Sequence, residues 1–225
     1  MPTPFTHKGL TVPYIAAWSG ERLHEPDIVT AKRWDGLADG IAFEDSFNVN
    51  GFAAGRDKNG VLWKRWSLGQ GRGEPEFNVP HVPRAKLAMR KLLCQVCGGP
   101  SDVNALGRLF LLEDNRHVQG WPEREITTHP PLCREHAHVA AQQCPHLHKG
   151  VVAVRAGRVK VDCVYGNVYA DSGGPFPTLV EKKAIVPFDD PRLRWTLATQ
   201  LAATLYDVTV GDLSELVEER KMASA

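Results

Sequence analysis

Short apolar runs separated by turn-forming residues fill the N-terminal third of the chain, a pattern typical of strands. Pro13 interrupts the first run and favours an edge strand there, because proline cannot donate a hydrogen bond to a neighbouring strand. Further along, Asn59-Gly60 separates segments 47–53 and 61–68. Asn-Gly is the strongest short-range signal for a hairpin. The pattern therefore predicts that these two segments are neighbouring strands.

The middle of the chain changes to helical spacing. Residues 83–93 combine a proline at the start with apolar and basic positions, which predicts a helix that begins near Pro83. An alanine-rich segment that follows Cys133 predicts a second helix, which Pro145 ends. Between the two helices, the apolar run 107–113 predicts a strand.

In the last third, valine-rich segments predict strands at 151–154, 159–165 and 167–170. A helix is then predicted to begin at Asp190-Pro191, with aspartate as N-cap and proline in the first turn. Its apolar stripe would consist of leucines that recur every fourth residue, Leu193, Leu197, Leu201 and Leu205.

A final helix is expected to begin at Thr209-Val-Gly-Asp212, which resembles a capping box, and to run through Leu216. The spacing of these two helices is that of a helix-turn-helix, but Glu215, Glu218 and Glu219 would repel DNA phosphates. We therefore expect a helical hairpin that packs on the sheet, with a dimer contact as one use of its outer face.

Composition narrows the class of protein. The 225 residues are 43% hydrophobic and 24% charged, ordinary values for a soluble globular chain, and the net charge of +1 gives no global attraction to nucleic acid or an anionic membrane. The N-terminus lacks a signal-peptide pattern, and no apolar run approaches the ~20 residues that span a bilayer. Five cysteines, an odd number clustered at metal-ligand spacing, suit a reducing compartment. We expect a cytoplasmic protein without a membrane partner.

The most specific chemical signal is a pair of metal-ligand motifs. Cys94-x-x-Cys97 is followed by Cys133-x-x-His136, the spacing that a tetrahedral zinc site needs. If Cys133 lies in the first turn of a helix, His136 lies on the same face one turn further on. The motifs predict that Cys94, Cys97, Cys133 and His136 bind a structural Zn²⁺ ion.

Cys144 is an alternative fourth ligand. On an unbroken helix it would lie eleven residues from Cys133, roughly 16 Å at about 1.5 Å per residue, so it can join the site only if the helix ends early. A second metal held by Cys144, His146 and His148 is a further alternative, since residues two apart share one face of an extended segment.

The frame from Leu93 to His136 resembles the treble-clef zinc fold and, within it, the zinc-carrying HNH endonucleases. That resemblance covers about residues 90–148 and implies a histidine that activates water beside a catalytic ion. Where the family has an Asp-His pair this chain has Glu113-Asp114-Asn115, so a nuclease would have to use His117 as the base, on a hairpin of changed register. The further histidine that the resemblance implies early in the closing helix would be His138. The overall layout also resembles proteins of unassigned role from actinobacteria and their phages.

The helix at 83–93 is also a candidate contact surface. It carries four positive charges and no acid, on Arg84, Lys86, Arg90 and Lys91. These side chains could contact the phosphates of a nucleic acid or the surface of a protein partner. Alternatively, their aliphatic stems cover a core while their charged ends stay in water.

Together these patterns predict an α+β protein in three parts: a β-rich region over 1–82, the basic helix and zinc module over 83–150, and strands with a helical hairpin over 151–225. The expected function is that of a zinc-stabilised cytoplasmic binding or regulatory protein. The alternative is a divergent HNH-type, metal-dependent nuclease.

Overall fold

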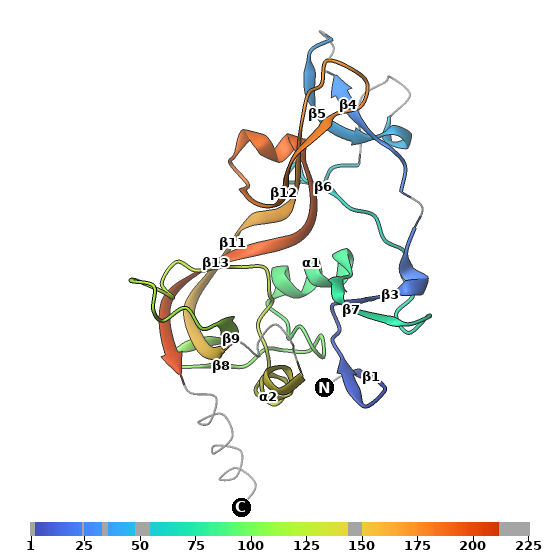
Figure 1. Ribbon diagram of the computed structural model, residues 1–225. Helices are drawn as coiled ribbons and strands as arrows, with labels where there is room; N and C mark the ends of the chain where they lie inside the picture. The colour runs from blue at the N-terminus through green and yellow to red at the C-terminus, as the bar shows by residue number, and fades with distance from the viewer. Residues whose placement is uncertain (1–2, 24, 33–35, 48–54, 144–149, 212–225) are drawn as a thin grey trace, which may run out of the picture.

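The computed structural model describes residues 3–23, 25–32, 36–47, 55–143 and 150–211 (Figure 1). Within these residues the protein is a strand-rich α+β fold with two α-helices, which confirms the predicted fold class. A seven-stranded sheet runs through most of the molecule; α1 contacts its strand β13 and α2 contacts its strand β9, and β5 of the N-terminal region contacts β13.

Two long antiparallel strands, β11 (Val151–Ala170) and β13 (Thr196–Gly211), form the centre of the sheet. The other edge of β11 pairs first with β9 (Gly107–Glu113) and then with β12 (Thr178–Pro187). Three two-residue strands complete the sheet: β8 (Val103–Asn104) beside β9, and β10 (Ile126–Thr127) and β6 (Leu62–Trp63) beside β13.

The N-terminal region is built from short strands, as its pattern predicts. They form three ladders: β1 (Phe5–His7) with β2 (Leu10–Val12), β3 (Ala16–Trp18) with β7 (Pro75–Pro80), and β4 (Ile28–Lys32) with β5 (Ala38–Phe43). Two 3₁₀ turns, η1 (Ser19–Glu21) and η2 (Glu44–Ser46), follow β3 and β5. A turn forms at Asn59-Gly60, where Gly60 has a φ of 77°, but most of the predicted partner segment 47–53 lies outside the described residues.

Two of the predicted helices form where the sequence places them. Helix α1 (Val82–Lys91) begins after His81, whose side chain accepts a hydrogen bond from the Arg84 N–H, and it ends at Leu92 in the left-handed region. Helix α2 (Arg134–Gln143) begins directly after Cys133. No helix in the described part of the chain is long and apolar enough to cross a membrane.

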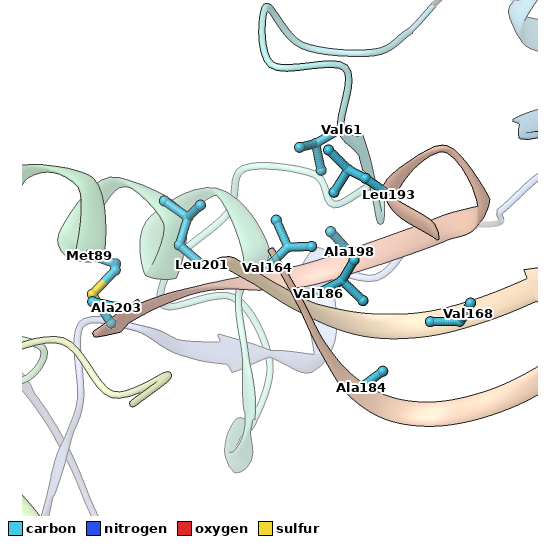
Figure 2. Packing of buried hydrophobic residues seen from close by; sticks show 10 residues of the cluster. All are labelled: Val61, Met89, Val164, Val168, Ala184, Val186, Leu193, Ala198, Leu201 and Ala203. Atoms are coloured by element: carbon cyan, nitrogen blue, oxygen red, sulfur yellow. The ribbon is translucent and has the colours of Figure 1, made fainter. Parts of the chain in front are cut away.

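Helix α1 packs on the sheet through Met89 (Figure 2). The methionine side chain lies beside Ala203 of β13, in a cluster of small and branched side chains that also includes Leu193 from the turn before β13. Because close-packed interiors leave little free volume, this contact fixes the helix and the chain that leaves it toward Cys94.

The predicted helix that begins at Asp190 is wrong. Asp190 does cap a helical turn, but this is the 3₁₀ helix η4 (Pro191–Trp195), and the chain then enters β13. A repeat of four residues also places side chains on one face of a strand, whose period is two, so the leucine stripe suits both structures. The segment forms a strand because β13 pairs with β11 along almost its whole length.

The predicted strands at 151–154, 159–165 and 167–170 are parts of the single strand β11. Gly166 keeps the strand continuous, because a Cβ there would lie 2.2 Å from the Leu197 carbonyl oxygen of the neighbouring strand. The expected last helix falls almost entirely on residues 212–225, outside the described residues, so that helix stays a prediction. The helical hairpin with its dimer contact is wrong, because its first helix is strand β13.

Candidate metal centre

The fold brings together the four side chains that the sequence motifs single out. One potential ligand atom from each lies within 4.8 Å of the others, and all four residues are buried: Cys94, Cys97, Cys133 and His136. In the part of the chain that the structure describes, no other histidine, cysteine or carboxylate residues form such a group of three or more. The four side chains could therefore hold one metal ion.

The first two ligands lie on a tight turn. The Gly98 N–H donates to the Cys94 carbonyl at 2.8 Å, and the Cys94 N–H donates to the Gly99 carbonyl at 2.8 Å. Gly98 has a φ of 70°, a conformation that residues with a Cβ rarely adopt, so glycine makes this turn accessible. These bonds turn the Cys94 and Cys97 thiols toward one point.

The second pair comes from the start of α2. The Leu132 N–H donates to the Leu109 carbonyl of β9 at 3.0 Å, which fixes the chain just before Cys133. The Ala137 N–H donates to the Cys133 carbonyl at 2.9 Å and begins the helix. One turn on, His136 places its Nδ1 3.0 Å from the Cys133 Sγ, as the predicted helical spacing requires.

An ion pair ties the two halves of the site to the main sheet. The carboxylate of Asp102 lies 2.5 Å from the Arg155 guanidinium of β11 and 3.7 Å from that of Arg134 in α2. The Asp102 N–H donates to the Leu132 carbonyl at 2.8 Å. Arg155 is buried, so this pair is poorly screened by solvent and holds the module in one position on the sheet.

The surroundings of the four ligands are apolar. The cysteines belong to one buried cluster with side chains of β9, β11 and α2, among them Leu109, Leu111, Leu132, Ala137 and Ala153. Water is excluded from such a cluster, so the thiols and imidazole have only each other, nearby backbone groups or a metal ion as polar partners.

The three thiols influence one another strongly. A hydrogen bond with Cys133 lowers the pKa of the Cys94 thiol to about 5. Burial raises the pKa of Cys97, and the hydrogen bond with Cys94 together with burial raises that of Cys133. The protein alone thus favours one thiolate. A bound cation supplies the positive charge with which all three thiols deprotonate.

The two histidines that a nuclease would need lie apart from this cluster, and both are exposed. His117 is in the turn after β9, close to Asp114, whose pKa hydrogen bonds from Arg116 lower to about 2. His138 is on α2, with its Nε2 3.0 Å from Nε2 of Gln142. The alternative ligands Cys144, His146 and His148 lie outside the described residues.

Two of the four cations of α1 have partners within the chain. Arg84 is buried and makes two hydrogen bonds, of 2.5 and 2.7 Å, to the Glu21 carboxylate. The Lys86 ammonium lies 2.9 Å from the Asp57 carboxylate and 4.0 Å from the Trp63 ring centroid. Only Arg90 and Lys91 are exposed, at the C-terminal end of the helix.

The buried Glu21–Arg84 pair is a structural feature that sequence reasoning missed. Glu21 also accepts from the Trp18 and Gly69 N–H groups, and Arg84 also donates to the Tyr14 and Ala16 carbonyls. Burial opposes the ionisation of Glu21, but the hydrogen bonds from Arg84 and the Trp18 N–H outweigh it and lower its pKa. The pair therefore stays charged, and it joins α1 to the N-terminal segment.

His81 completes the network in its neutral form. Its Nδ1 accepts from the Arg84 N–H, so its Nε2 carries the proton and donates to the Ser67 carbonyl at 2.9 Å. Burial lowers the pKa of His81. No sequence signal identifies this residue, because an isolated histidine before a helix has no spacing partner.

No protein-family model, curated protein or solved structure matches this chain. The resemblance to treble-clef proteins and to HNH endonucleases therefore rests on the ligand spacing alone. The structure brings the four residues of that spacing together in one buried group that could hold a metal ion.

Proposed function

We propose that this chain is a zinc-stabilised binding or regulatory protein in which Cys94, Cys97, Cys133 and His136 hold a structural Zn²⁺ ion. The convergence of three thiols and one imidazole in a buried site carries this proposal. Zn²⁺ prefers four such ligands in tetrahedral sites, and structural sites are closed, with no position for substrate. Soft thiolate donors disfavour Mg²⁺ and Ca²⁺, which prefer oxygen.

Several further features agree with a structural role in a reducing, cytoplasmic compartment. The four described cysteines are free thiols, and the side chains of the site are buried in one cluster with residues of β9 and β11. The treble-clef interpretation fits the order of elements, with a cysteine turn, a hairpin made by β8 and β9, and then a helix that brings the second ligand pair. The exposed His117 and His138 give no observation in favour of a nuclease, and we do not propose one.

The purified protein is expected to contain one tightly held zinc ion per chain, because the ligand set is complete and buried. Elemental analysis after gel filtration in metal-free buffer measures the zinc content. The Cys163→Ala variant is the matched control, since Cys163 is a buried thiol on β11 that does not belong to the group of four, and it should retain the ion. A chain that contains no zinc, and takes none up from stoichiometric zinc salt, would contradict the proposal.

Partner contacts are proposed for the exposed end of α1. We expect Arg90 and Lys91 to give weak, sequence-independent binding to duplex DNA that falls steeply with salt, because phosphate contacts release counterions. Fluorescence anisotropy with a labelled duplex at several salt concentrations measures it. The Arg90→Ala, Lys91→Ala double variant should lose this binding. A double variant of the exposed Lys58 and Lys182, which removes the same charge elsewhere, should not.

Binding that is unchanged in the Arg90→Ala, Lys91→Ala variant would contradict this use of α1. Tight binding that persists at high salt would indicate specific recognition by another surface. If the protein does not bind DNA even at low salt, nucleic acid is excluded as its partner, and the proposed partner is another protein.

A further inference from the structure

The turn between the first two metal ligands is also the attachment point of the N-terminal segment. The Tyr14 N–H donates to the Val96 carbonyl at 2.8 Å, and the Ile15 N–H donates to the Gln95 carbonyl at 3.2 Å. Gln95 and Val96 are the two residues between Cys94 and Cys97. The acceptors for the segment are therefore carbonyl groups whose direction depends on how the two cysteines are held.

Two more contacts join this segment to the metal-binding module. A Cβ on Gly98 would lie 3.0 Å from the Tyr14 ring, so the ring packs closely on the turn. The Thr11 N–H donates to the Gln143 side chain at 2.9 Å, and β2 packs on α2 (Figure 1). Helix α2 carries the second ligand pair at its start, so its position also depends on the metal.

A different set of contacts holds the residues that follow. Ala17 pairs with Glu76 between β3 and β7, and the Ser67 N–H donates to the Glu21 carbonyl at 3.0 Å. The buried Glu21–Arg84 pair joins the same stretch to α1. These contacts involve neither the four ligands nor the residues between them.

We propose that the metal ion controls the contacts of residues 11–15 with the module, an inference that rests on the proposed zinc site. When the ion is removed, the three buried thiols and His136 lose their common partner, and the turn at Gln95-Val96 no longer presents its carbonyls in a fixed direction. Single hydrogen bonds contribute only about 0.5–1.5 kcal/mol each, so these contacts are lost once the acceptors move. The segment itself keeps its place, because Arg84 donates to the Tyr14 carbonyl, the His81 N–H donates to the Ile15 carbonyl, and residues 16–21 stay attached through β7 and Arg84.

Loss of these contacts would change the surface of the protein. Val12 packs with Ala16 and Trp18, so the β1–β2 hairpin stays with β3, and separation of the module uncovers the Tyr14 ring and the side of α2 that β2 covers. The loaded and the metal-free chain would thus present different surfaces to a partner, which makes zinc a regulator of exposure as well as a stabiliser.

Hydrogen–deuterium exchange of the full chain, with zinc and after chelation, tests this inference. In the metal-free protein we expect exchange at the Thr11, Tyr14 and Ile15 N–H groups to quicken at least about tenfold, the equivalent of about 1.4 kcal/mol. The Trp18 and Ser19 N–H groups should change by less than about twofold, and β11 and β13 should stay protected. Reloading with zinc should restore the original pattern.

A single substitution separates the effect of the Thr11–Gln143 contact from the effect of the metal. Gln143→Ala removes only the acceptor of the Thr11 N–H, so with zinc bound it should quicken exchange at Thr11 and leave Tyr14 and Ile15 protected. Unchanged protection after chelation, or an equal loss across 5–21 and the main sheet, would overturn the inference. Absence of zinc from the starting protein would instead show that the proposed site itself fails.

Discussion

Replacing Cys133 by alanine is expected to abolish zinc binding and to unfold the module formed by the cysteine turn, β8, β9 and α2. Structural Zn²⁺ contributes about 10–16 kcal/mol to the folding of zinc-finger peptides, as much as the whole stability of an ordinary domain, about 5–15 kcal/mol. The loss has a second component, because the remaining thiols are left in an apolar cluster without a cation. Zinc content and urea denaturation of the variant measure both effects.

The same result is expected for alanine at Cys94, Cys97 or His136, whereas Cys163→Ala serves as the control. Cys163 is a buried thiol whose pKa burial raises to about 12, so at neutral pH it is uncharged and acts as a small core side chain. Its replacement should retain zinc and cost only about 1 kcal/mol.

The series also distinguishes the alternative fourth ligand. Zinc that is lost in Cys144→Ala but kept in His136→Ala would indicate a four-cysteine site, contrary to the helical geometry that places His136 3.0 Å from Cys133. Zinc that is retained in Cys133→Ala would contradict the assignment altogether.

The four residues of the candidate metal site could be predicted from sequence because their spacing is local. Two residues between Cys94 and Cys97 form one tight turn, and two between Cys133 and His136 form one turn of helix, whatever the rest of the chain does. Local spacing does not predict that the Cys94–Cys97 pair and the Cys133–His136 pair come together. Their convergence depends on β9, whose Leu109 accepts from the Leu132 N–H and fixes the start of α2.

The C-terminal strand could not be predicted in the same way. Its leucine repeat satisfies the helical and the extended period alike, and the deciding interaction is pairing with β11, whose partner residues lie 28 to 58 positions earlier. Thr196, Thr199 and Thr204 are the local signal for a strand, since β-branched residues favour extended backbone. The leucine stripe, in contrast, led to the prediction of a helix.

The role of Arg84 illustrates another limit of local patterns. Beside Lys86 and Arg90 it looks like one more charge of a solvated helix face, yet it is buried against Glu21, a residue 63 positions earlier. Charge in a sequence says nothing of a partner that only the tertiary fold supplies. The structure therefore reduces the candidate contact surface of α1 to Arg90 and Lys91.

Replacing Arg84 by methionine is expected to destabilise the protein by about 3–5 kcal/mol, because it leaves the Glu21 carboxylate buried and unpaired. Urea denaturation of the zinc-loaded protein measures the change. The double variant Glu21→Gln, Arg84→Met removes the buried charge as well, so it should recover part of the loss.

Arg90→Met is the matched control for that measurement, because Arg90 is exposed on the same helix and its replacement should change stability by no more than about 0.5 kcal/mol. Zinc content should stay at one ion in all three variants, since neither Glu21 nor Arg84 belongs to the metal group. If Arg84→Met is as mild as Arg90→Met, the pair does not hold the N-terminal segment to α1. If Arg84→Met loses zinc, the two anchors of that segment are not independent, and metal control over the contacts of residues 11–15 alone would have to be given up.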